Sequence, residues 1–162
     1  MKMTMNHDFE RVRRLAIESM WAVRLQHRRL NSHEPEDARF VTRRVADWHF
    51  FIVALTRFRK VVCLASAIKA ICPDVKKQLA EFDAKLPGRQ NMRDIAEHID
   101  DYAIGAGKVR FKDPKDLEFI RLDDKEFVWM DETINADDAL AAAESLFLSI
   151  GGLRKKAMAR EV

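Results

Sequence analysis

The sequence predicts a mainly α-helical domain, a helical bundle of four to five helices with a β-hairpin before the last helix. Apolar residues recur at three- and four-residue steps along most of the chain, which is typical of amphipathic helices. Only five Gly and four Pro occur among 162 residues, which favours long helices over a many-stranded sandwich. Apolar residues make up 48% of the chain and charged residues 34%, a balance that fits one core in a single domain, residues 1–162.

The first two helices are predicted from apolar periodicity and from the break between them. Residues 8–31 form one amphipathic pattern, and Pro35 then disfavours helix at the residue before it. A second, long helix is expected from about Glu36 to Ile71, with Pro73 ending it. Its residues 48–55 are apolar on nearly every side, so we expect them to be covered by neighbouring helices or by a partner subunit. This stretch is the basis for expecting a homodimer.

Two shorter helices are expected next. An amphipathic pattern runs through Val75, Leu79, Phe82 and Leu86 and stops at the pair Pro87 and Gly88. A fourth helix is expected from Asn91, a suitable N-cap, to about Ile104, where Gly105 and Gly107 end it.

The following region changes character. Residues 117–130 partly alternate apolar and charged side chains and are rich in β-formers in the second half, which predicts a β-hairpin turning at residues 123–125. Asn135 is then expected to cap a last helix from Ala136 to about Ile150, with Asp137 and Asp138 in its first turn.

Charge is unevenly distributed along the chain, although the net charge is only +3. Residues 1–89 carry 18 Lys and Arg against 10 Asp and Glu, whereas residues 90–162 carry 11 against 16. The asymmetry fits an electrostatically paired homodimer, a basic groove for a polyanion, or simply solvated helix faces. No apolar stretch is long enough to span a bilayer, no secretory signal is evident, and Cys63 and Cys72 form no zinc-type cluster, so we expect a cytoplasmic protein without membrane contact.

One short motif suggests chemistry. Residues 93–98 read Arg-Asp-Ile-Ala-Glu-His, an Arg, a polar residue, three further residues and a His. The imidazole of His98 suits proton transfer near neutral pH, and the guanidinium of Arg93 suits a phosphate because it is always charged and forms paired hydrogen bonds. The pattern resembles the signature of the HEPN superfamily, whose members are helical and often dimeric. The resemblance implies a metal-independent endoribonuclease of a defence or toxin setting, with Arg93 and His98 catalytic and two protomers joining their motifs in one cleft.

The same residues allow other interpretations. Five residues turn a helix by about 140°, so Arg93 and His98 are expected on opposite flanks of the buried stripe. Asp94, Glu97 and Tyr102 would be the supporting polar residues, but Asp100 stands where the toxin branch of the family carries Tyr. Arg93 could instead pair with Glu97 at four-residue spacing. The alternative function is a non-enzymatic helical homodimer acting as an interaction protein.

Other candidate sites are less developed in the sequence. Arg57, Arg59 and Lys60 beside Phe58 resemble a basic and aromatic patch for nucleic acid, or else a solvated helix end. His49, among aromatic residues, is expected to be a hydrogen-bonded buried or interface histidine. Asp94, His98 and Asp101 share a helix but lack a second ligand-bearing segment, so no metal is expected. No cofactor motif is present, and RNA remains the one polymeric ligand that the residues suggest.

Overall fold

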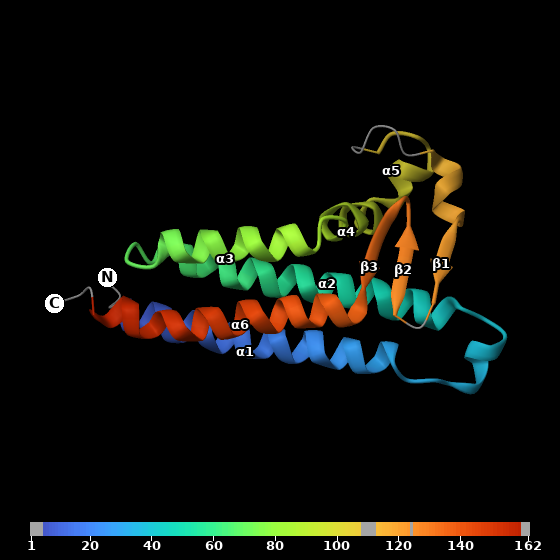
Figure 1. Ribbon diagram of the computed structural model, residues 1–162. Coiled ribbons are helices and arrows are strands. Elements are labelled where there is room, and N and C mark those ends of the chain that lie inside the picture. Colours follow the sequence, from blue (N-terminus) through green and yellow to red (C-terminus); the bar gives the residue numbers. More distant parts are fainter. Residues whose placement is uncertain (1–4, 108–112, 124, 160–162) are drawn as a thin grey trace.

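A computed structural model describes residues 5–107, 113–123 and 125–159 and confirms the mainly α-helical bundle (Figure 1). Four long helices lie side by side, and two short helices and a small antiparallel sheet cover one end of them. The helices are α1 (Met5–Leu30), α2 (Thr42–Leu64), α3 (Cys72–Lys85), α4 (Arg89–Glu97), α5 (Ile99–Ala103) and α6 (Ala136–Ala159). The strands are β1 (Ile120–Leu122), β2 (Glu126–Trp129) and β3 (Glu132–Asn135).

Helix α1 forms where periodicity predicts it and packs between α2 and α6. Its buried residues Phe9, Val12 and Ala16 continue at helical spacing through Met20 and Val23. Helix α6 runs antiparallel to α1, as two hydrogen bonds between them show. Arg24 binds Glu144, and His27, which comes later in α1, binds Asp137, which comes earlier in α6. The two helices therefore form one lower face of the bundle (Figure 1).

The prediction of the second helix, from about Glu36 to Ile71, is wrong at both ends. A short 3₁₀ helix η1 (Pro35–Ala38) and an irregular stretch precede α2, which begins only at Thr42. At the other end α2 stops at Leu64 and continues into a second 3₁₀ helix, η2 (Ala65–Ala67). Pro73 does not end α2 but lies in the first turn of α3, where its fixed φ and missing N–H cost nothing.

The apolar stretch of α2 is mostly covered within one chain. Trp48, Phe51 and Leu55 are buried against the neighbouring helices and the sheet, and so are Ile52 and Ala54. Two side chains of the stretch are exposed to solvent: Phe50 is 59% exposed and Val53 is 43% exposed. The stretch therefore lies centrally, with one uncovered side.

The predicted hairpin is confirmed, and the sheet has a third strand. Strands β1 and β2 pair antiparallel with Leu122 opposite Phe127, and the Asp123 carboxylate accepts hydrogen bonds from the N–H groups of Lys125 and Glu126 (2.8 and 2.6 Å). Asp124, the middle residue of the predicted turn, lies outside the described residues. The first arm is shorter than predicted because residues 117 and 118 belong to the 3₁₀ helix η3 (Pro114–Glu118).

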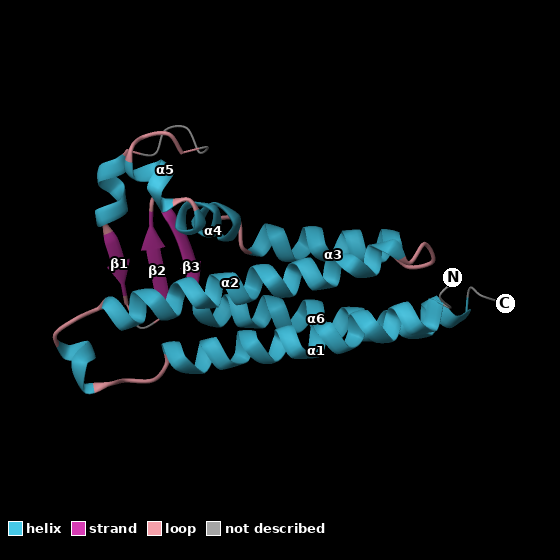
Figure 2. Ribbon diagram, turned by 180° about the vertical axis from the view of Figure 1, so that it is seen from behind, coloured by secondary structure: helices cyan, strands magenta, loops and turns pink. Residues whose placement is uncertain are grey.

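Strand β3 follows β2 through a tight turn at Met130 and Asp131, whose φ angles are 53° and 62°. Two consecutive positive φ angles are typical of the type I′ turns that join hairpin strands. Inward-facing side chains of β2 pack on α2, with Phe127 stacked on Trp48 at 5.5 Å between ring centroids. The sheet therefore closes the end of the bundle over α2 (Figure 2).

The last helix begins as predicted and ends later. The Asn135 side chain accepts hydrogen bonds from the N–H groups of Asp137 and Asp138 (3.0 and 3.1 Å), which caps α6. The helix continues through Gly151 and Gly152 rather than ending there. Within the described ranges, no helix combines the length and apolar character needed to cross a membrane.

Candidate functional site

The predicted fourth helix is divided at His98. Helix α4 ends at Glu97, α5 begins at Ile99, and His98 between them has φ −123° and ψ 37°, outside the helical region. Asn91 is not the N-cap, because α4 begins at Arg89. Its side-chain amide instead donates a hydrogen bond to Glu132 on β3 (2.6 Å). The N–H of His98 still donates to the main-chain oxygen of Asp94 (3.1 Å), so the chain leaves α4 at His98 itself, after Arg93.

Arg93 is held by carboxylates of its own helix. Its guanidinium donates to Asp94 (2.9 Å) and forms a close ion pair with Glu97, as four-residue spacing allows. The side chain is partly exposed. Its two terminal nitrogens each bind one of these carboxylates, which neutralise the guanidinium and would compete with a phosphate for it.

His98 is exposed at the helix break, close in sequence to several further carboxylates, among them Asp100 and Asp101. Tyr102 is buried rather than presented to solvent, and its ring lies so near Gly107 that a Cβ there would come within 2.3 Å of it. The structure therefore places Arg93, Asp94 and Glu97 in one ion-paired group, with His98 at its end and Tyr102 in the core.

The proposed nucleic-acid residues of α2 do not act as one group. Arg57 and Lys60 are exposed on the outer side of the helix, whereas Phe58 is fully buried. Arg59 turns toward α3 and binds both oxygens of the Asp83 carboxylate (2.9 and 2.6 Å). Only two of the three cations thus face solvent together.

A buried ionic group joins α2, α3 and α4. Arg89 is only 3% exposed and donates to Thr56 (2.9 Å) and to Asp83 (3.1 Å), which also holds Arg59. Burial by itself raises the pKa of the Asp83 carboxyl, but the hydrogen bonds and charges of Arg59 and Arg89 outweigh it and leave the pKa below its usual value. Burial lowers the pKa of the Arg89 guanidinium, against the opposing influence of Asp83. The terminal nitrogens of Arg89 are bound by Thr56 and Asp83, whereas its Nε is buried without a partner among the described residues, and the three-helix arrangement fits a structural role.

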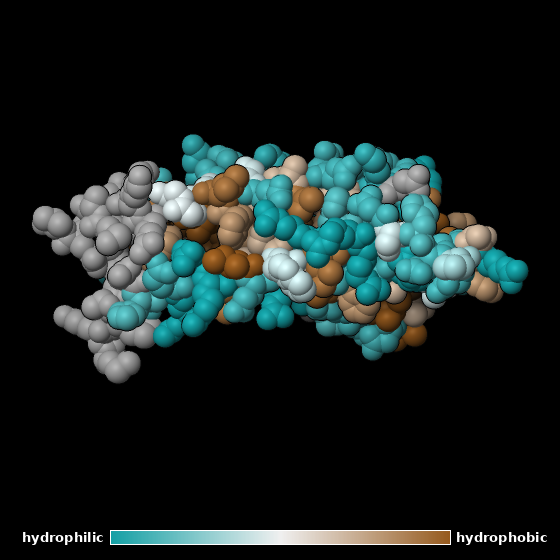
Figure 3. Space-filling view, turned by 90° about the horizontal axis from the view of Figure 1, so that it is seen from below, coloured by the Kyte–Doolittle hydropathy of each residue, from teal (hydrophilic) through white to brown (hydrophobic). Residues whose placement is uncertain are grey.

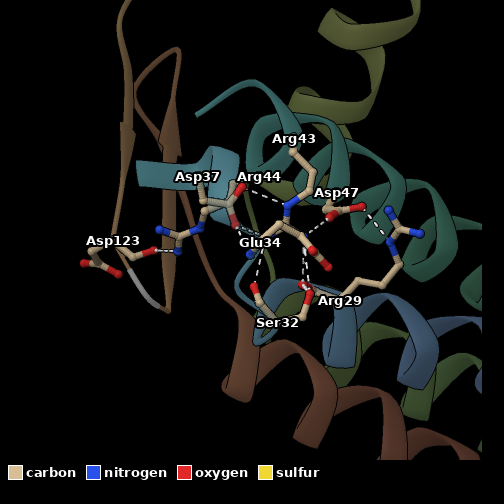
Figure 4. Close-up of polar contacts among 8 residues, drawn as sticks. All are labelled: Arg29, Ser32, Glu34, Asp37, Arg43, Arg44, Asp47 and Asp123. Atoms are coloured by element: carbon tan, nitrogen blue, oxygen red, sulfur yellow. Dashed lines mark hydrogen bonds and ion pairs between the residues drawn. The ribbon is translucent and has the colours of Figure 1, made fainter. Parts of the chain in front are cut away.

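A second ionic group fixes the connection between α1 and α2 (Figure 4). Arg43 donates to both Asp37 and Asp47 (2.9 Å each) and to the main-chain oxygen of Ser32 (2.9 Å). Asp47 is 1% exposed and also accepts from Arg29 (2.8 Å). The hydrogen bond from Arg43 holds the pKa of the Asp37 carboxyl well below its usual range. Neither ionic group was predicted, because each joins residues on separate elements.

His49 lies between α2 and the sheet, with its ring centroid 5.0 Å from that of Trp129 and 5.7 Å from that of Phe127. Burial lowers the pKa of its imidazole. The expectation of a hydrogen-bonded histidine is wrong for Nε2, which is buried without a partner among the described residues, as is Nε1 of Trp48. Among the residues that the structure describes, no three His, Cys, Asp or Glu side chains gather in a way that could hold a metal ion.

Exposed apolar side chains gather on the lower face of the bundle, and we call this surface the α1–α6 face. It comprises Ile17 and Trp21 on α1 and Leu148 on α6, of which Trp21 is 60% and Leu148 is 72% exposed. Trp21 precedes Arg24 by three residues and Leu148 follows Glu144 by four. Because Arg24 and Glu144 are bonded across antiparallel helices (3.0 Å), Trp21 and Leu148 both lie about one turn from that ion pair, in the same direction. Figure 3 looks onto this side and shows apolar atoms between polar ones.

Comparison of the chain with protein-family models, curated proteins and solved structures found no match. The resemblance to the HEPN superfamily therefore rests on residues 93–98 and on the helical layout.

Proposed function

We propose that the protein is a non-enzymatic interaction protein that acts as a homodimer formed through the α1–α6 face. The observation that carries this proposal is the position of Trp21 beside Leu148, two large apolar side chains exposed on neighbouring helices. Contiguous exposed apolar side chains with a polar surround are typical of protein interfaces, and Trp is enriched among the residues that dominate binding energy.

Charge complementarity is found at one end of the face. Arg28 is exposed on α1, and Asp138 is exposed on α6 at about the same level. A two-fold axis running along the face between the helices would set α1 of each copy against α6 of its partner. In that arrangement Trp21 opposes Leu148 of the partner subunit, and Arg28 lies near the carboxylate of Asp138 across the interface.

The size of the face is sufficient for a stable dimer. Helices α1 and α6 contain 26 and 24 residues. Two such helices side by side present on the order of 700 Å², close to the roughly 800 Å² per partner of a standard interface. The uncovered side of α2 is less suited to self-association, because its exposed charges, Arg57 and Lys60, are both positive.

Trp21→Glu tests the dimer. The substitution places a carboxylate at the centre of the face and is expected to cost at least about 2 kcal/mol of association, raising the dissociation constant about thirtyfold or more. Light scattering at micromolar concentration should give about twice the 18.8 kDa chain mass for the wild type and a lower mass for the variant. The matched control is Phe119→Glu, because Phe119 is equally prominent but lies beside β1, away from this face. A monomeric wild type, or equal dissociation of both variants, would remove the proposal.

RNA cleavage is the second candidate function, favoured by the exposure of His98, which directly follows Glu97, the ion-pair partner of Arg93. If these residues act, cleavage should persist in excess EDTA and leave cyclic phosphate ends, and His98→Ala should lower the rate by about a hundredfold or more. His33→Ala is the control, since His33 is also exposed but belongs to the α1–α2 connection. Glu97→Gln should raise the rate, because it frees Arg93 from one anion. Activity that requires a divalent metal, or that survives His98→Ala, would contradict the mechanism.

A further inference from the structure

The solvent-facing side of α2 carries a regular row of exposed residues, which we call the α2 stripe. Its members follow steps of four, three, four, three and four residues: Ala46, Phe50, Val53, Arg57, Lys60 and Leu64. All six are exposed, and the fully buried Phe51, Leu55 and Val62 lie on the opposite side of the helix. Alternating steps of three and four residues are the spacing with which one helix packs along another.

The large apolar members of the stripe are only partly covered by the described part of the chain. Phe50 and Val53 form one apolar end, and Leu64, which is 52% exposed, forms the other. The stripe spans 18 residues after its first, or roughly 27 Å of helix, which is enough to seat a helix of about five turns. A surface of this length and spacing fits an amphipathic helix better than a small ligand or a loop.

The charge of the stripe indicates what kind of helix it would bind. Its charged members, Arg57 and Lys60, form no ion pair with any described residue. The acidic residue of α2, Asp47, is buried and already bound by Arg29 and Arg43. A second copy of the same stripe would add only positive charge, whereas a partner helix with carboxylates beside its apolar residues would neutralise both cations.

We propose that the α2 stripe docks an acidic amphipathic helix of another protein. Phe50, Val53 and Leu64 would receive the partner's apolar side chains, and Arg57 and Lys60 would meet its carboxylates. RNA is a poorer fit, because four of the six stripe residues are apolar and Arg59, the third cation of this segment, is held by Asp83. The proposal does not depend on the dimer, since its residues lie on α2 and none belongs to the α1–α6 face.

The test uses the full chain and a designed probe. The probe is a fluorescent helical peptide of about three heptads with Leu at positions a and d and Glu at positions e and g. A second peptide of identical composition but scrambled Leu spacing controls for charge alone, and a single-stranded RNA oligonucleotide represents the competing ligand. Fluorescence anisotropy should show saturable binding of the first peptide, weakened by added salt, and tighter than binding of either control.

Variants of the stripe locate the binding. Phe50→Glu and the double variant Arg57→Glu with Lys60→Glu should each weaken peptide binding by about tenfold or more, since each removes a contact and adds repulsion. These side chains are exposed, so the thermal stability should change little. Phe119→Glu, which changes an exposed apolar residue beside β1 that belongs to neither surface, should leave peptide binding unchanged. Absent binding, equal binding of the scrambled peptide, tighter binding of RNA, or indifference to Phe50→Glu would each overturn the proposal.

Discussion

Replacing Asp83 by Ala is expected to lower the free energy of unfolding by about 3–5 kcal/mol, the usual cost of leaving a buried charge without its partner. Arg89 is almost wholly enclosed and would retain only its hydrogen bond to Thr56. Arg59 would lose the same anion, but it is partly exposed and can turn to water. The loss of stability therefore arises mainly at Arg89, and the packing of α2, α3 and α4 against one another would be weakened.

Urea unfolding followed by circular dichroism would measure this effect, and the melting temperature should fall by about 2–4 °C for each kcal/mol lost. Glu81→Ala is the matched control in the same helix, because the ion pair that Glu81 forms with Lys77 among the described residues is exposed, and its loss should change stability by about 0.5 kcal/mol or less. Adding Arg89→Met to Asp83→Ala should restore part of the loss by removing the unpaired charge. A double variant less stable than Asp83→Ala would contradict the proposed cause.

The parts of the fold that could be predicted are those determined by residues close together in the sequence. Helix α1 follows from the spacing of Phe9, Val12 and Ala16, and the start of α6 follows from the cap at Asn135. The β1–β2 hairpin follows from partly alternating apolar and charged residues around a polar turn, with β-forming residues in the second arm. In each case the deciding interactions join residues a few positions apart, which a single sequence reveals.

The missed features depend on contacts across greater distances or on unusual turns. No Gly or Pro marks the start of α2 at Thr42. The preceding segment is fixed by Arg43, which reaches back to Asp37 and Ser32. Strand β3 was missed because Met130 and Asp131 lack the Asn-Gly or Asp-Gly pattern that usually marks a type I′ turn.

The candidate site shows the same division. Its ion pair between Arg93 and Glu97 could be predicted from four-residue spacing. The helix break at His98 could not be predicted, because no Pro or Gly directly precedes it. Helix α5, which follows the break, packs against η3, a contact between segments distant in the sequence. The α1–α6 face was also missed, since the exposure of Trp21 becomes evident only when the neighbours of α1 are known. The apolar stretch of residues 48–55 drew attention to α2 instead.

Replacing Arg43 by Met is expected to lower the free energy of unfolding, because the ion pairs that Arg43 forms with Asp37 and with the buried Asp47 are lost. Asp37 would lose its ion pair with Arg43, and the Ser32 carbonyl would lose the hydrogen bond that Arg43 donates to it. Asp47 would keep its hydrogen bond from Arg29. Arg39→Met is the control, since Arg39 lies in the same connection and is exposed. Urea unfolding at neutral pH should therefore distinguish the two variants clearly.

The pH dependence of the Arg43→Met effect identifies its cause. In the folded wild type the pKa of Asp37 lies below its unfolded value of about 3.9, so this ion pair stabilises the fold above that pH and ceases to do so as the pH falls through the folded pKa. Without Arg43 the folded pKa of Asp37 should rise toward the unfolded value, and the variant should lose less stability on acidification. The stability difference between wild type and variant should thus be largest near neutral pH and narrow below about pH 4. A difference that stays constant down to acidic pH would show that Arg43 acts through packing of its side chain rather than through its ion pairs.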